Sequence, residues 1–373
     1  MNHAPRHSRA HRVPGRHVHW RLARHRRRLL GAGAAATVLA VVGPGLLAGL
    51  SDDDPAGITT YTILGAEYGY QLLWVLAVST AALIVFHELG VRLGIVTGKG
   101  LMTLIRERFG HRAAMLVIMA LLIADVGLMA GPDWGQTARG LVVPSMPLTR
   151  DAALTAVATV GTTLAPWGLA FIQSYAVDKQ LTVDELRYER GDVIVGAVLT
   201  GVIGLFVVVA CAATLHPAGI SIDDGKDAAR AREPLAGGAA STLFGLGFVG
   251  AALLAAAIVP LSTAYSVSEA FGGRADLDSR FSEEPAFYTS FGLVVLVAAS
   301  VVLIPGAPLI PLLFLTQALN AVLLLVVLPF MRSLASAREL LGAHALGRTG
   351  RWSTGLALAL IALSVLALAV LTL

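Results

Sequence analysis

Three consecutive aspartates, Asp52 to Asp54, interrupt a long apolar stretch near the start of this sequence, and Pro55 and Gly57 follow them closely. The run from Leu29 to Leu50 before them carries no charged residue. A carboxylate within a membrane costs roughly 3 kcal/mol on insertion scales, so it is usually retained for a function. A proline beside it frees main-chain carbonyls that only a buried, polar or water-lined setting satisfies. Carboxylates together with freed carbonyls indicate a cation site.

A second interpretation places the three aspartates in an ordinary loop after the first helix. The mostly apolar stretch that follows Gly57 ends near Ala66. A membrane-spanning helix needs about 20 apolar residues. Because this stretch is too short to span a bilayer alone, one broken helix explains the pattern better than two separate helices joined by a loop.

Composition places the chain among polytopic membrane proteins. It is 56% hydrophobic and only 14% charged, with a mean hydropathy of +0.73, far from an ordinary soluble domain. The single cysteine, Cys211, excludes an intrachain disulfide framework. The sequence shows no Cys/His cluster with zinc spacing, no Ser-His-Asp constellation and no Gly-rich phosphate loop. We therefore expect neither an enzyme with a bound cofactor nor a nucleic-acid-binding protein.

The apolar runs predict an all-α transmembrane domain over residues 29–373, preceded by a basic, disordered cytoplasmic tail over residues 1–28. Most of the 28 Lys and Arg fall on one side of the membrane when the amino terminus is cytoplasmic. The positive-inside rule then places the carboxyl terminus on the outer side of the cell membrane. We expect nine spans, at residues 29–66 (interrupted), 71–91, 113–131, 151–177, 193–215, 239–265, 288–304, 308–331 and 352–373.

A second interruption falls in the fourth expected span, between Gly161 and Gly168. Pro166 there removes a helical hydrogen bond and clashes with the carbonyl of Thr162. The alternative is a simply kinked helix, which is common in membrane proteins. However, the first and fourth spans cross the membrane in opposite directions, and two interrupted antiparallel spans are typical of inverted-repeat transporters with a site at the bilayer midplane.

Short motifs recur along the chain around the two interruptions and at later helix ends. They are Gly43-Pro44-Gly45, Asp54-Pro55-Ala56-Gly57, Glu67-Tyr68-Gly69-Tyr70, Gly94-Ile95-Val96-Thr97-Gly98-Lys99, Thr162-Thr163-Leu164-Ala165-Pro166-Trp167, Gln173-Ser174, Val177-Asp178-Lys179 and Ile304-Pro305-Gly306-Ala307-Pro308. These motifs resemble the NRAMP family of divalent metal transporters, and the later ones resemble its bacterial magnesium-transporting relatives. The resemblance covers nearly everything from Leu29 onward and implies a LeuT-like inverted-repeat fold with two broken helices.

The resemblance assigns a metal site to the two breaks. Asp54 matches the metal-binding aspartate, and Thr162 matches the residue that offers its main-chain carbonyl. Gly57 stands where other members have an asparagine ligand, and Ala165 where they have a methionine. Loss of the thioether disfavours soft ions, and a roomier site with oxygen ligands suits a hydrated magnesium ion. We therefore expect magnesium or manganese as the transported ion, with Asp54 as the ligand in preference to Asp52 and Asp53.

Three further positions extend this prediction. Gln317 and Asn320 lie three residues apart, on one face of the eighth expected span. We interpret Gln317 as a group that holds a water of the hydrated ion, and the alternative is a hydrogen bond between helices. Trp167 matches the family's histidine after the proline and cannot titrate. We therefore expect uptake that is not coupled to protons.

One departure from the family is large. Its members have eleven helices, so their second broken helix is the sixth, whereas here it is the fourth. About two helices are missing, in the region of the family's third to fifth helices.

We expect a secondary transporter that moves divalent metal ions across the cytoplasmic membrane by alternating access. Two alternatives are a shortened relative that does not transport and a LeuT-like symporter of an organic solute, for which Trp167 and Gln173 are the only support. The sequence does not indicate an oligomeric state.

Overall fold

The chain divides into two units, Met1–Gly43 and Pro44–Leu373, and every helix below belongs to the second. The computed structural model describes residues 43–109, 139–219, 239–273, 277, 279–305 and 308–372. The predicted tail over residues 1–28 and the predicted span over residues 113–131 lie outside these residues. The predicted loss of about two helices falls in the same region as that span, so it also lies outside them.

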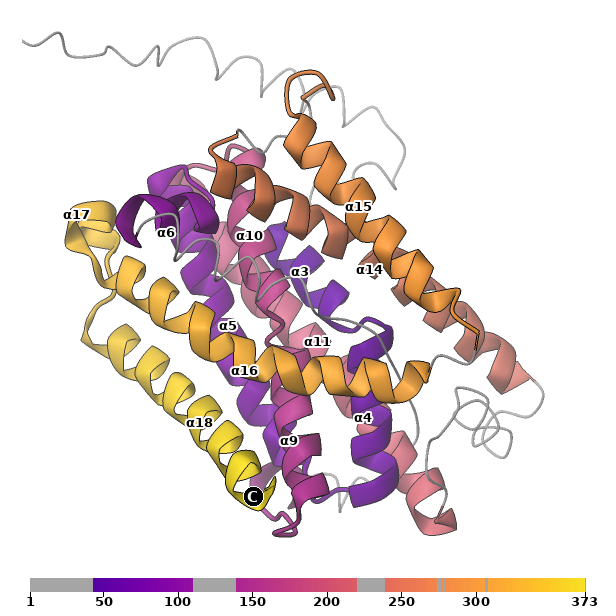
Figure 1. The fold of residues 1–373 in the computed structure, drawn as a ribbon. Helices are drawn as coiled ribbons and strands as arrows, with labels where there is room; N and C mark the ends of the chain where they lie inside the picture. The colour runs from indigo at the N-terminus through magenta and orange to yellow at the C-terminus, as the bar shows by residue number, and fades with distance from the viewer. Residues whose placement is uncertain are drawn as a thin grey trace, which may run out of the picture. The chain divides into compact units, whose positions relative to one another are not determined.

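Within these residues every regular element is helical, as the sequence predicts (Figure 1). The elements are α3 (Pro44–Asp52), α4 (Pro55–Tyr68), α5 (Leu73–Thr97), α6 (Leu101–Phe109), α9 (Arg150–Thr163), α10 (Pro166–Asp178), η1 (Val183–Glu185), α11 (Leu186–Ala218), α14 (Ala239–Phe271), α15 (Pro285–Val302), α16 (Leu309–Ser336), α17 (Arg338–Leu341), η2 (Gly342–His344) and α18 (Arg348–Thr372).

Seven helical stretches of the described residues are long and apolar enough to cross a membrane, with α9 and α10 counted as one. They match seven of the nine predicted spans. α3 and α4 together form the interrupted first span. α15 and α18 are the least buried of the seven, and they present leucines to the outside of the bundle. Apolar side chains exposed in this way are typical of a helix that faces lipid.

Both predicted interruptions are confirmed. The first lies at Asp53 and Asp54, between α3 and α4, and the second at Leu164 and Ala165, between α9 and α10. A proline begins the second half of each broken helix. Because proline has no N–H, the carbonyls four residues earlier, those of Ser51 and Thr162, lose their helical donors.

The two broken helices pack against each other in antiparallel fashion. α3 contacts α10, and α4 contacts α9 (Figure 1). The Tyr61 hydroxyl of α4 lies 3.0 Å from the hydroxyl of Thr163, at the end of α9, and both groups are buried. The two breaks therefore lie side by side inside the bundle, as an inverted repeat requires.

α11 supports both halves of the first broken helix, since it packs along α3 and along α4. The contact with α3 depends on small residues. A side chain at Gly49 would start 2.6 Å from the Gly196 carbonyl oxygen of α11, and one at Gly45 would start 2.5 Å from the Cα atom of Val193. Glycines four residues apart allow this close approach of two helix backbones in a membrane.

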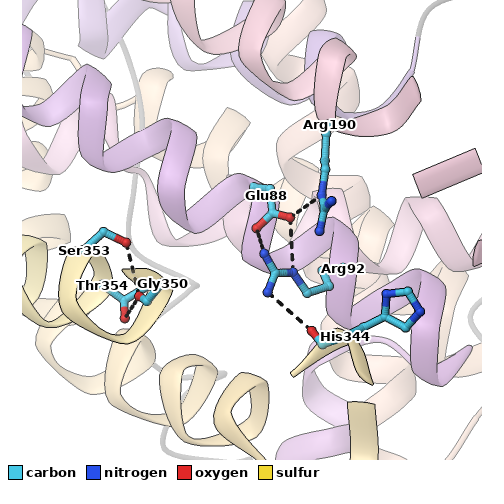
Figure 2. Close-up of polar contacts among 7 residues, drawn as sticks. All are labelled: Glu88, Arg92, Arg190, His344, Gly350, Ser353 and Thr354. Atoms are coloured by element: carbon cyan, nitrogen blue, oxygen red, sulfur yellow. Dashed lines mark hydrogen bonds and ion pairs between the residues drawn. The ribbon is translucent and has the colours of Figure 1, made fainter. Parts of the chain in front are cut away.

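One side of the bundle gathers several helix ends and is here named the α6 side. α6 contacts α5, α10, α14 and α16, and α17 contacts α5 and α16. α5 ends there at Gly98, whose left-handed conformation (φ 64°) caps the helix. Figure 2 shows an ion-pair network at this side: Glu88 pairs with Arg92 (2.5 Å) and with Arg190 of α11 (2.7 Å), and Arg92 donates to the His344 carbonyl.

Candidate metal centre

Asp54 caps the amino terminus of α4. Its Oδ1 atom accepts hydrogen bonds of 2.8 Å from the main-chain N–H groups of Ala56 and Gly57. Its extended backbone (φ −69°, ψ 172°) is usual for such a cap, and Pro55 occupies the first helical position. The carboxylate is thus held in one orientation at the positive end of the helix dipole.

Gly57 brings the two broken helices close together at this point. A Cβ atom on Gly57 would lie 2.5 Å from the Asp52 carbonyl oxygen, 3.0 Å from Thr162 Oγ1 and 3.6 Å from Asp54 Oδ1. The structure therefore places two predicted site residues, Asp54 and Thr162, around Gly57, with Asp54 Oδ1 and Thr162 Oγ1 no more than about 6.6 Å apart. In this conformation, the space that an asparagine side chain would need is occupied by the end of α3.

The second break offers carbonyl oxygens and no side-chain ligand. Thr162 lies in the last turn of α9, where the carbonyl dipoles point toward the break, and its own carbonyl lacks a helical donor because of Pro166. Ala165 precedes α10 and supplies no side-chain cap. It packs in an apolar cluster that includes Ala48 and Trp167.

The two amides on α16 lie together, as the sequence predicts. Asn320 Nδ2 donates to Gln317 Oε1 at 2.9 Å, and both side chains are buried. This bond lies within α16 and does not join two helices. The Gln317 Nε2 and Asn320 Oδ1 atoms make no hydrogen bond within the described residues. A side chain at Gly161 would collide with the Gln317 carbonyl, so the amide pair packs against the last turns of α9.

All three aspartates are buried, with Asp52 and Asp54 each 1% exposed and Asp53 4%. The four carboxyl oxygens of Asp52 and Asp53 have no hydrogen-bond partner among the described residues. Buried carboxylates are costly unless they are paired or bind a cation. In the described part of the chain, no group of three or more His, Cys, Asp or Glu side chains could hold a metal ion. A cation here would therefore have few side-chain ligands and would also need carbonyl oxygens or water.

Sequence reasoning missed the surroundings of His87. The predicted second span ends at residue 91, which places His87 near its end, but α5 continues to Thr97 and His87 is fully buried. A histidine within an apolar helix was the available signal. His87 lies close to the first break, since a Cβ atom on Gly168 would be 3.6 Å from His87 Nε2 and 3.2 Å from Asp52 Oδ1. This proximity depends on how the helices cross and could not be predicted from sequence spacing.

The described fold is that of a membrane transporter with two broken helices. It matches the crystal structure of the Eremococcus coleocola manganese transporter in complex with an aromatic bis-isothiourea substituted compound, with a TM-score of 0.65 and 17% sequence identity over 95% of this chain and 88% of that one. Two mutant structures of the same transporter match equally well, at a TM-score of 0.66.

The family model of natural resistance-associated macrophage protein-like (Nramp) proteins matches residues 45–131 and 126–371, so the chain belongs to this family. Two relatives are both named divalent metal cation transporter MntH. The one from Burkholderia ambifaria is 28% identical over an alignment 280 residues long, and the match covers 56% of this chain and 63% of the relative. The one from Pectobacterium carotovorum is 27% identical over 58% of this chain and 68% of the relative. The predicted family and fold are confirmed.

Proposed function

We propose that this chain carries divalent metal ions across the cytoplasmic membrane by alternating access around Asp54. The observation that carries the proposal is the position of the Asp54 carboxylate. It lies at the start of α4, and its Oδ1 atom is no more than about 6.6 Å from Thr162 Oγ1 in the last turn of α9, where the Thr162 carbonyl lacks a helical donor. A negative side chain and a carbonyl dipole converge there from two broken helices, which is the arrangement that binds cations in inverted-repeat transporters.

The ligand set favours a hard ion that keeps much of its water. Asp54 offers one carboxylate, and neither Gly57 nor Ala165 supplies a side-chain ligand. Magnesium is bound in proteins by few carboxylates and several waters, and sulfur ligands do not favour it. Manganese accepts the same oxygen ligands, and the structurally similar transporter of Eremococcus coleocola is a manganese transporter by name. The proposed cargo is therefore magnesium or manganese, bound weakly.

Alternating access agrees with the burial of the site. Asp54, Thr162 and Gln317 are each at most 2% exposed, so bulk solvent does not reach these side chains in this conformation. A cavity of about 1140 Å³ opens on the side opposite α6, lined by Tyr68 at the end of α4 and by His216. We propose this cavity as the outer vestibule, with the α6 side facing the cytoplasm.

A symporter of an organic solute finds no support in the site. Trp167 is 1% exposed and packs in an apolar cluster, and its carbonyl accepts a hydrogen bond from Ser262. Gln173 donates to the Lys99 carbonyl at 2.9 Å, on the α6 side. Trp167 therefore packs in the core, and Gln173 holds a main-chain carbonyl. The second candidate function, a relative that inserts but does not transport, rests on length, since the chain spans only 63% of the Burkholderia relative.

Uptake into proteoliposomes separates these functions. The purified chain should import magnesium and manganese when a negative internal potential is imposed, and Asp54→Ala should abolish uptake. Asp184→Ala is the matched control, because Asp184 is exposed in η1. Uptake by the wild type that Asp54→Ala does not reduce would refute the proposed site, and no uptake by the wild type would favour the second candidate.

The same assay tests proton coupling. An internal pH dye should report no acidification, as expected from Trp167 at the position of the family's histidine.

A further inference from the structure

A second polar group of side chains lies next to the first break, on its α6 side. It consists of Asp52 at the end of α3 and His87 in the middle of α5, with Gly168 of α10 between them. Asp52 lies on the α6 side of Asp54 because α3 begins there. The Leu46 N–H of α3 donates to the Asp192 carboxylate, near the start of α11, at 3.0 Å.

The Asp52 and His87 side chains face the same small space. A Cβ atom on Gly168 would lie 3.2 Å from Asp52 Oδ1 and 3.6 Å from His87 Nε2. The two atoms are therefore no farther apart than the sum of these distances, about 6.8 Å. Gly168 carries no side chain, so this space between the carboxylate and the imidazole remains open.

Neither side chain has a hydrogen-bond partner within the described residues. Asp52 is 1% exposed and His87 is 0% exposed. Both carboxyl oxygens of Asp52 and both ring nitrogens of His87 lack partners there, so the two groups do not bond to each other either. Buried polar side chains are nearly always satisfied by protein, water or a bound ion. Two unsatisfied groups around one space indicate a ligand that both could contact.

We propose that Asp52 and His87 form a second cation-binding station, which takes a divalent transition-metal ion such as Mn²⁺ on the α6 side of Asp54. This inference rests on the proposed transport function. A carboxylate oxygen and an imidazole nitrogen are a usual ligand pair for such ions, whereas magnesium prefers oxygen ligands alone. Two ligands of one ion lie up to roughly 4.4 Å apart, since each ligand lies about 2.0–2.2 Å from the metal, so on binding the two side chains must approach each other by at most about 2.4 Å. Water completes the coordination.

The station would allow this chain to distinguish manganese from magnesium, which the site at Asp54 alone does not do. The site at Asp54 offers only oxygen ligands, so it treats hydrated magnesium and manganese alike. An ion that moves from Asp54 toward the α6 side next meets Asp52 and His87. Asp52 attracts both ions, but the imidazole nitrogen of His87 is a better ligand for manganese than for magnesium, so manganese is held there more strongly.

The test uses the purified full chain in detergent, in the Asp54→Asn background, which removes the first site. One Mn²⁺ per chain should remain bound, and pulsed EPR should show coupling of the metal to an imidazole ¹⁴N nucleus. His87→Gln should remove that coupling and weaken Mn²⁺ binding at least tenfold, and Asp52→Asn should weaken it to a similar extent. His344→Gln is the matched control, because the network in Figure 2 uses only the main-chain carbonyl of His344.

Gly168→Ala provides a variant that keeps both ligands. Its methyl group fills the space between them, and alanine favours a helix more than glycine does. It should abolish the ¹⁴N coupling without lowering the melting temperature. Mn²⁺ binding in the Asp54→Asn background without ¹⁴N coupling, or no binding at all, would overturn the proposal. Either result leaves the transport function untouched, because that function is tested by uptake and by Asp54→Ala.

Discussion

The two breaks in the bundle differ in how their helix ends are satisfied. At the first break the Asp54 carboxylate caps α4 with two hydrogen bonds, and two more buried carboxylates lie beside it. At the second break Ala165 precedes α10 without a side-chain cap, and its neighbours are apolar. The first break therefore supplies charge and the second supplies main-chain dipoles. A cation between them would be neutralised from one side only.

The breaks also differ in the helices that hold them. α11 packs along both halves of the first broken helix. α5 contacts both halves of the second, but their other main partners differ, because α9 packs on α16 and α18 whereas α10 packs on α14. α11 holds α3 and α4 in a fixed relation along its whole length, whereas α10 is tied to α14 and α9 to α16 and α18. We therefore infer that the second broken helix bends more readily than the first.

The largest expected effect concerns the charge of the first break. Asp54→Asn keeps the shape of the cap but removes the charge, so metal affinity should fall by roughly 100-fold, as expected when a buried charge loses its partner. Asp53→Asn should weaken binding by no more than roughly fivefold, since Asp53 does not cap α4. Isothermal titration with Mg²⁺, which the proposed second station does not favour, measures both. Equal losses in the two variants would show that the aspartates act as a shared cluster.

A second substitution tests the support of the first break by α11. Gly49→Ala places a methyl group 2.6 Å from the Gly196 carbonyl oxygen and 2.9 Å from the Thr200 hydroxyl, so α3 must move away from α11. Overpacking of this kind costs about 1–3 kcal/mol. Gly292→Ala in α15 is the matched control, since nothing lies within 4 Å of the added atom. Thermal unfolding in detergent should show a lower midpoint for Gly49→Ala alone. An unchanged midpoint would mean that α3 is not held by this contact.

These contrasts show which parts of the molecule can be predicted from its sequence. Pro55 and Pro166 locate both breaks, because a proline removes a helical donor wherever it lies. The three-residue spacing of Gln317 and Asn320 predicts their common face. Helix crossings cannot be obtained in this way, since they depend on contacts between distant segments. The sequence therefore gives no indication that Gly168 leaves space between α3 and α5.

The third prediction alters the apolar character of the second break. Ala165→Met adds a thioether, which soft ions prefer, next to a site with oxygen ligands. Competition by cadmium against magnesium uptake should become roughly tenfold stronger, which corresponds to about 1.4 kcal/mol. Ala165 is 2% exposed in an apolar cluster, and the flexible methionine side chain adapts to such surroundings. If the wild type already binds cadmium in preference to magnesium in this assay, the site is not a hard-ion site.

The smallest expected effect concerns the link between α10 and α14. The Ser262 hydroxyl of α14 donates to the Trp167 carbonyl in the first turn of α10, at 2.7 Å, and both residues are buried. Ser262→Ala removes this bond and should cost about 1 kcal/mol. If α10 and α14 move together, hydrogen exchange should increase in the first turns of α10 and remain unchanged in α9.

Ser300→Ala is the control for that variant, because the Ser300 hydroxyl donates to the Leu296 carbonyl within α15, on the exposed face of the helix. It removes a serine hydroxyl without affecting any contact between helices. Equal exchange in α9 and α10 after Ser262→Ala would show that the second broken helix responds as one rigid element. The inferred difference in mobility between the two broken helices would then be wrong, although their difference in charge would remain.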